Sequence, residues 1–296
     1  MQEKNSAGNP WVKAARPRTL PAAVIPVLVG SGLAASVDSF TWLPALICMV
    51  FALLVQIGTN FANDYYDWKQ GADDERRIGP TRAVASGLIE PDRMKLMAIL
   101  TLALAFFIGL SLICWGGWWL LAVGIASVVS AVAYTAQPIA LGYRGLGDIF
   151  VILFFGFVAV GFTTFVQAGY FPAAVWPSGL AIGLLANNLL VINNYRDCEL
   201  DAAAGKRTLI VRFGPRLGES LVLGSLVVSL LLCFGFAFIE GNLFALSAVL
   251  GLIPIFRAWR QMPKTRGKEG FSKLLQQSAQ GLFVFGILLT IGLFFG

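Results

Sequence analysis

Residues 42–67 read WLPALICMVFALLVQIGTNFANDYYD, an apolar run that ends in a cluster of Asn, Asp and Tyr. About 20 mostly apolar residues are needed to cross the hydrocarbon core of a bilayer. Residues 42–63 meet that length, and acids follow them at once. If the helix continues past residue 63, Asn60, Asp64 and Asp67 stand at i, i+4 and i+7 and share one face. The stretch therefore predicts a membrane-spanning helix that presents carboxylates at one end.

The composition extends this interpretation to the whole chain. Of 296 residues, 57% are apolar, 13% are charged and none is His, and the mean hydropathy is +0.75. Soluble domains carry roughly 25% charged residues, so most of this surface must face lipid rather than water. Disordered chains and secreted disulfide scaffolds are excluded. The lack of His also excludes His-based catalytic triads and two-His zinc sites.

Nine apolar runs of spanning length are separated by polar breaks. We therefore predict an all-α integral membrane protein with nine transmembrane helices, in which residues 1–296 form a single membrane-embedded domain. The runs cover residues 20–37, 42–63, 94–114, 118–136, 147–167, 173–194, 219–239, 242–258 and 276–295.

The basic residues predict the orientation in the membrane. All 22 Lys and Arg lie before the first run, in alternate links, or at the edges of the runs that face those links. Short basic loops stay on the cytoplasmic side. We therefore expect a multi-pass protein of the cell's inner (plasma) membrane, with a cytoplasmic N-terminus and an external C-terminus. Orientation and attraction to anionic lipid account for the net charge of +6, so no nucleic-acid partner is expected.

A second acidic segment, NNYRDCELDAAAGKRT at residues 193–208, follows the sixth run. On a continued helix, Asn193, Asp197 and Asp201 stand at i, i+4 and i+8 and form a second carboxylate group. Carboxylates at a helix C-terminus are disfavoured by the helix dipole, so positive charge must compensate. Neighbouring Lys and Arg are one source. A divalent cation between the two helix ends is another, and Mg²⁺ suits these oxygen ligands. Two solvated, ion-paired loops are the plain structural alternative.

Basic residues follow the acids closely in both segments. Guanidinium and ammonium groups are the donors that bind phosphate, and the apolar interior suits a long hydrocarbon tail. The pattern therefore predicts an amphiphilic diphosphate ligand. The basic residues concerned are Lys69, Arg76, Arg77, Arg82, Lys206 and Arg207.

Several strings resemble one enzyme family. They are RPRTLP at 16–21, NDYYD at 63–67, GPTRAVASG at 79–87, GLGD at 145–148, and NNYRD at 193–197 with the segment 201–208. Together they are similar to the UbiA superfamily of intramembrane aromatic prenyltransferases. Within it they are most similar to the enzymes that act on 1,4-dihydroxy-2-naphthoate in menaquinone synthesis. The resemblance spans nearly the whole chain.

The resemblance implies helices arranged around a cytoplasm-facing active-site cavity. The implied reaction is Mg²⁺-dependent transfer of a polyprenyl group from polyprenyl diphosphate to 1,4-dihydroxy-2-naphthoate, with loss of CO₂, giving demethylmenaquinol. It implies metal ligands at Asp64, Asp67, Asp197 and Asp201, and catalytic roles for the last three and Asp73. The implied substrate-binding residues are Arg16, Asn60, Asn63, Lys69, Arg76, Arg77, Arg82, Tyr134, Arg144, Asp148, Asn193, Asn194, Lys206 and Arg207.

Two departures from the family pattern bear on the acceptor. Gly71 stands where many members have the last Asp of the first motif, and Asp73 or Asp74 is the expected replacement. Pro138 stands where the hydroxybenzoate branch has Lys, with Arg144 as the candidate substitute. Both departures weaken the assignment to the hydroxybenzoate branch and are compatible with the naphthoate branch, and another aromatic acceptor such as 4-hydroxybenzoate is the alternative. A secondary transporter is disfavoured because transporter sites lie near the midplane of the bilayer, whereas these charges gather at one boundary.

Overall fold

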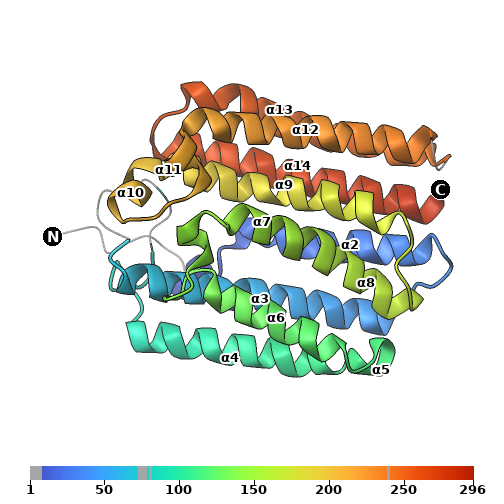
Figure 1. The fold of residues 1–296 in the computed structure, drawn as a ribbon, viewed down its shortest axis with the longest axis horizontal. Helices are drawn as coiled ribbons and strands as arrows, with labels where there is room; N and C mark the ends of the chain where they lie inside the picture. The colour runs from blue at the N-terminus through green and yellow to red at the C-terminus, as the bar shows by residue number, and fades with distance from the viewer. Residues whose placement is uncertain (1–8, 73–78, 80–81, 239–240) are drawn as a thin grey trace.

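The computed structural model describes residues 9–72, 79, 82–238 and 241–296, and this part of the chain forms a bundle of helices without strands (Figure 1). Five long, unbroken helices run along the bundle: α3 (Trp42–Lys69), α4 (Pro91–Leu110), α9 (Val175–Arg196), α12 (Pro215–Phe238) and α14 (Gly267–Phe295). The short helices α10 (Cys198–Ala203) and α11 (Leu209–Phe213) lie at one end of the bundle, and the C-terminus lies at the other.

The remaining helices are shorter or interrupted. Helix α1 (Pro10–Ala15) and the turn η1 (Pro17–Thr19) precede α2 (Pro21–Ala35), and α5 (Ile113–Gly116) precedes α6 (Leu120–Ala133). The turn η2 (Leu141–Arg144) leads to α7 (Gly147–Val151), which continues through the π-helical turn η3 (Ile152–Val158) into α8 (Ala159–Ala168). The turn η4 (Leu243–Gly251) continues into α13 (Leu252–Gln261) and the turn η5 (Met262–Lys264).

The predicted fold class is confirmed, whereas the count of nine spans is not. In the described ranges, seven helical segments are long and apolar enough to cross a membrane, and an eighth is obtained if α1, η1 and α2, bent by 48°, count as one span. The predicted run at residues 118–136 falls on α6, whose 14 residues are fewer than the roughly 20 that a straight span requires. All nine predicted runs nevertheless fall on apolar helices, and the chain is a multi-pass membrane protein.

Helix α3 follows the prediction and α9 departs from it. Helix α3 continues without a break through Asp64 and Asp67 to Lys69. Helix α9 ends at Arg196, and α10 starts at Cys198, so Asp197 lies at a junction where its φ of −95° and ψ of 8° leave the helical region. The prediction that Asn193, Asp197 and Asp201 share one continuous helix is therefore wrong.

Helix α9 lies at the centre of the bundle and contacts its neighbours through glycine. A Cβ atom added at Gly156 in η3 would lie 2.3 Å from the carbonyl oxygen of Gly179 in α9. A Cβ added at Gly183 would lie 2.8 Å from the carbonyl oxygen of Ile152. Small residues allow helix backbones in a membrane to approach this closely. The contact fixes η3, which borders the cavity described below, against the helix that carries the second acidic segment.

We expect Gly156→Ala to destabilise the protein by about 1–3 kcal/mol, because the new methyl group meets backbone rather than a flexible side chain. The measurement is the thermal unfolding temperature of the purified protein in detergent. The control is Gly224→Ala in α12, where an added Cβ meets no atom within 4 Å. Equal unfolding temperatures for the two variants would contradict the packing argument.

Candidate active site

One cavity of about 1380 Å³ runs through the bundle beside α3. Its lining follows one face of α3 from Cys48 to Asp67, which corresponds to about 28 Å of helix. The lining changes from apolar residues such as Phe51 and Val55 to amides and then to carboxylates along this path. The cavity therefore offers a long apolar section and, at the end of α3, a strongly charged one.

Asp67 is the centre of the charged section. It is buried, and its carboxylate accepts hydrogen bonds from Arg82 Nη2 at 2.8 Å and from the Tyr143 hydroxyl at 2.8 Å. The Lys206 ammonium lies 3.5 Å from Asp67 Oδ1 and 3.4 Å from Asp201 Oδ1. Lys206 thus joins a carboxylate of the first acidic segment to one of the second, although these two acids lie far apart in the chain.

The second acidic segment contributes two buried carboxylates. Arg196 binds Asp197 through two bonds, Nε to Oδ1 at 2.7 Å and Nη2 to Oδ2 at 2.6 Å. Burial raises the pKa of the Asp201 carboxyl above its ordinary value, and the nearby Lys206 ammonium opposes that rise. Lys206 also lies 4.6 Å from the ring centre of Tyr143, where cation–π attraction helps to hold it.

Asp64 occupies a different place from Asp67. Its side chain is 2% exposed, and its two oxygens accept hydrogen bonds from the backbone N–H groups of Ala83 at 3.2 Å and Val84 at 3.0 Å. Two such bonds hold the loop that follows the first acidic segment against the end of α3. This loop carries Arg82, so Asp64 fixes the position of the guanidinium that contacts Asp67.

The donors suit a hard divalent cation, but the described side chains form no preassembled site. Among these residues, no three acids, Cys or His are close enough together to hold one metal ion. Asp67, Asp197 and Asp201 instead face cationic partners. Carboxylate oxygens are what Mg²⁺ prefers, and it commonly takes one or two of them together with substrate phosphates. Asp67 and Asp201 would hold such an ion if the Lys206 ammonium, which lies 3.5 Å and 3.4 Å from them, paired with an incoming anion instead.

Most of the predicted site residues line this one cavity. They are Arg16, Asn60, Asn63, Asp64, Asp67, Arg82, Tyr134, Asn193, Asn194, Asp197, Asp201 and Lys206. Asp73, Arg76 and Arg77, together with Asp74, lie outside the described residues. The acid that replaces the motif position at Gly71 therefore stays a prediction.

Four predicted substrate-binding residues do not line the cavity. Lys69 is exposed, because it stands two positions beyond Asp67 on α3 and thus on a different helix face. Arg144 and Arg207 line a separate pocket of about 520 Å³ together with Arg212. Asp148 is buried and accepts a hydrogen bond from Asn187 Nδ2 at 3.0 Å, which ties α7 to α9. None of these four residues lines the cavity beside α3, and their roles in substrate binding stay predictions.

Other residues at the cavity are absent from the sequence predictions. Tyr143 reaches Asp67 from η2, a position that depends on the fold of a long connection. Gln56 had a detectable signal, because it stands one turn before Asn60 on the acidic face of α3. Arg18 also lines the cavity, and it donates a hydrogen bond to Ser272 Oγ of α14 at 2.5 Å. Nothing in the spacing of the sequence predicts that α14 contributes here.

Known proteins are similar to this chain in sequence and in structure. Residues 23–293 match the model of the UbiA prenyltransferase family. The 1,4-dihydroxy-2-naphthoate octaprenyltransferase of Escherichia coli is 35% identical over 99% of this chain and 97% of its own length. The enzyme of the same name from Mycobacterium tuberculosis is 41% identical over 76% of each chain.

Solved structures show the same fold at low sequence identity. A UbiA homolog from Aeropyrum pernix superposes with a TM-score of 0.70 at 16% identity, covering 91% of this chain and 98% of that one. A UbiA homolog from Archaeoglobus fulgidus, solved with DMAPP and Mg²⁺, superposes with a TM-score of 0.62 at 16% identity, covering 96% and 100%.

Proposed function

The chain belongs to the UbiA prenyltransferase family, and from this premise we propose that it transfers a polyprenyl group from polyprenyl diphosphate to 1,4-dihydroxy-2-naphthoate. In this proposal the reaction depends on Mg²⁺, releases CO₂ and diphosphate, and gives demethylmenaquinol for menaquinone synthesis. The identity of the acceptor is supported by the names of the two bacterial relatives, which are 35% and 41% identical to this chain.

One arrangement supports the proposal above all others. The acids Asp67 and Asp201, from segments far apart in the chain, lie within 3.5 Å of one ammonium group at the charged section of a long cavity that also has an apolar section. An amphiphilic diphosphate needs both parts, an oxygen-rich and cationic section for its head and an apolar channel for its tail.

We assign Asp67, Asp197 and Asp201 as the carboxylates that hold Mg²⁺. When bound, the metal neutralises charge on the departing diphosphate. Arg82 and Lys206 then contact the diphosphate oxygens, since both are buried beside these carboxylates. Asp64, also predicted as a metal ligand, is given an indirect role in this proposal, because both of its oxygens accept backbone N–H groups of the loop that bears Arg82.

Bond breaking at the allylic C–O bond leaves a carbocation that water would capture. The apolar lining around Phe154 and Phe155 excludes water from that carbon. The ring carbon that bears the acceptor carboxylate attacks this cation and forms the new C–C bond. The bond between that ring carbon and the carboxylate then breaks, and its electrons restore the aromatic ring as CO₂ leaves. No strong base is then required at that carbon, which agrees with a chain that has no His.

The same proposal includes the topology. The second acidic segment, at the junction of α9 and α10 and on α10, lies at the end of the bundle opposite the C-terminus (Figure 1). We propose that this end faces the cytoplasm across the inner membrane, that the C-terminus is external, and that residues 1–296 act as one catalytic unit.

The direct test supplies purified protein in lipid nanodiscs with Mg²⁺, a polyprenyl diphosphate and either 1,4-dihydroxy-2-naphthoate or 4-hydroxybenzoate. We expect coupled product from the naphthoate only, with one CO₂ released per product. Product from 4-hydroxybenzoate alone would overturn the acceptor. Equal rates with and without EDTA would overturn the metal assignment.

We expect Arg82→Gln to raise the KM for the prenyl diphosphate at least tenfold and to leave the KM for the acceptor unchanged. A charge-assisted hydrogen bond to phosphate contributes roughly 1.5–3 kcal/mol. The control is Arg93→Gln, because Arg93 is a solvent-exposed arginine whose ion pair with Glu90 lies at the surface. A higher KM for the acceptor alone would contradict the role of Arg82.

A further inference from the structure

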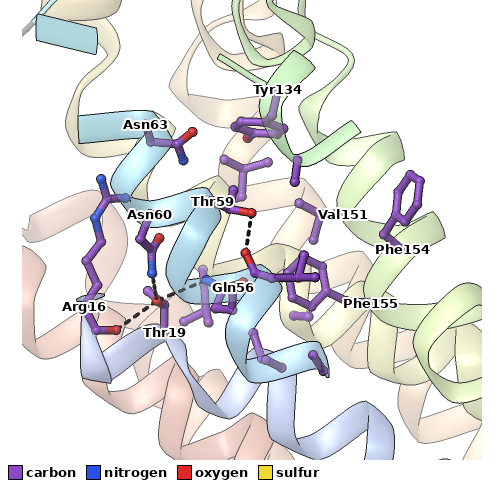
Figure 2. Close-up of a pocket in the computed structure, with 18 of the residues that line it drawn as sticks. Arg16, Thr19, Gln56, Thr59, Asn60, Asn63, Tyr134, Val151, Phe154 and Phe155 are labelled. Carbon is purple, nitrogen blue, oxygen red and sulfur yellow. Dashed lines mark hydrogen bonds between the residues drawn. The ribbon is translucent and has the colours of Figure 1, made fainter. Parts of the chain in front are cut away.

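A stripe of polar side chains continues along α3 from the acids into the cavity. Gln56, Asn60 and Asn63 all line it (Figure 2), and they precede Asp67 by eleven, seven and four residues. Gln56 and Asn60 are separated from the carboxylate by about 16 Å and 10 Å of helix, respectively. The stripe thus lies deeper than the diphosphate section.

Thr19 fixes the orientation of two of these amides. Its hydroxyl donates its single proton to the carbonyl oxygen of Arg16 at 3.0 Å. Toward Gln56 Nε2 at 3.3 Å and Asn60 Nδ2 at 3.4 Å it must therefore accept. Asn60 Nδ2 also donates to the carbonyl oxygen of Ala15 at 2.9 Å. A carbonyl oxygen can only accept, so this contact too requires the NH₂ group of Asn60 to point toward it. Both NH₂ groups are consequently held at the wall beside Thr19.

With the NH₂ groups at the wall, the amide oxygens are left for the cavity. Within the described part of the chain, no group donates a hydrogen bond to Gln56 Oε1 or to Asn60 Oδ1. Neither oxygen is fully buried, so both are accessible. Two hydrogen-bond acceptors, one helical turn apart, therefore face the interior. On the other side of the cavity lie Val151, Phe154 and Phe155 (Figure 2), apolar side chains that suit the faces of an aromatic ring.

We propose that Gln56 and Asn60 accept hydrogen bonds from the two ring hydroxyls of the aromatic acceptor, and that Thr19 positions the amides to do so. This inference rests on the proposed function and deepens it. Two acceptors spaced by one turn, about 5–6 Å between Cβ atoms, match hydroxyl groups on opposite sides of one ring. A site built to accept from both hydroxyls selects against a ring that has lost one of them, because a desolvated amide oxygen is left unpaired.

The test compares wild type with Gln56→Leu. The KM for the dihydroxynaphthoate is measured together with the inhibition constants for two analogues that each lack one hydroxyl, 1-hydroxy-2-naphthoate and 4-hydroxy-2-naphthoate. We expect wild type to bind the dihydroxy ring about tenfold more tightly than either analogue, the effect of one hydrogen bond. Gln56→Leu should raise the KM for the dihydroxy ring about tenfold and abolish the discrimination against one analogue only. The KM for the prenyl diphosphate should stay unchanged, which also shows that the variant is folded.

Thr19 supplies a second, independent series. Thr19→Val removes the hydroxyl that holds both amides and should weaken discrimination against both analogues, whereas Thr19→Ser keeps the hydroxyl and should restore it. Thr59→Val is the matched control, because Thr59 lines the same cavity but donates its hydroxyl to Val55 O of its own helix; its discrimination should equal that of wild type.

Two kinds of failure are distinguishable. If wild type turns over the naphthoate but Gln56→Leu weakens all three aromatic ligands equally, or none, the role of the amides is wrong and the proposed function stands. If wild type does not prenylate the naphthoate at all, the proposed acceptor is wrong and this inference fails with it.

Discussion

Asp67→Asn is expected to lower the turnover of prenyl transfer by roughly a thousandfold, within the range observed when a group that stabilises transition-state charge is removed. The carboxylate of Asp67 meets Arg82, Tyr143 and Lys206, all of them donors. An amide of the same size replaces one acceptor oxygen by a further donor and removes the charge that a divalent cation needs. The measurement is the single-turnover rate at saturating substrates.

Asp92→Asn is the matched control for this substitution. Asp92 is an exposed acid in the first turn of α4, outside the cavity lining, so its replacement should retain nearly full turnover. If Asp67→Asn kept a tenth or more of wild-type activity, Asp67 would not be a metal ligand, and the assignment of the charged section would have to change.

The second large effect is expected for Asp197→Asn, which should abolish turnover and also reduce stability. Arg196 is buried and bonded twice to Asp197. Removing one partner of a buried ion pair leaves an uncompensated charge and costs about 3–5 kcal/mol. Both the turnover and the thermal unfolding temperature in detergent should therefore fall.

A double variant separates the two effects. Arg196→Met combined with Asp197→Asn removes both charges, so we expect the unfolding temperature to recover most of its loss while turnover stays abolished. Recovery of turnover in the double variant would mean that Asp197 acts only by neutralising Arg196. The double-mutant cycle of these substitutions gives the interaction energy between Arg196 and Asp197.

The helices were predictable because membrane insertion imposes a simple rule. A stretch such as 42–63 must satisfy its backbone internally in lipid, so its apolar length suffices to predict a helix. The face shared by Asn60, Asp64 and Asp67 also followed from helical periodicity. The length of α6 did not, because its helix ends at Ala133, before the apolar run does. Apolarity predicts burial in lipid, but it does not say where a helix stops.

Side chains on loops were predicted less well, because their positions depend on contacts between distant segments. Arg144 and Lys206 belong to similar basic clusters, yet only Lys206 reaches the cavity. Lys206 is held by carboxylates of both acidic segments, whereas Arg144 donates to the carbonyl oxygen of Pro138 at 2.6 Å. Charge and spacing alone do not distinguish these two environments.

The break between α9 and α10 had no sequence signal of its own. Asp197 and Asp201 would share a face on a straight helix as well as on the observed bent one, where Asp197 N still donates to Asn193 O at 3.0 Å. Arg196 and Asp197, which pair with each other at the break, form a contact between adjacent residues that spacing rules do not contain.

The π-helical turn at residues 152–158 changes the angular phase between the residues before it and those after it. Such a wide turn accommodates about one residue more than ordinary α-helical winding would. Removing a single residue there should therefore restore ordinary winding while α7 and α8 keep nearly the same relative orientation, and the displacement should be confined to side chains within the turn, such as Phe154 and Phe155. Shortening the chain by one residue at this turn is thus a way to change one wall of the cavity locally, and an alanine scan of the same segment cannot reproduce it.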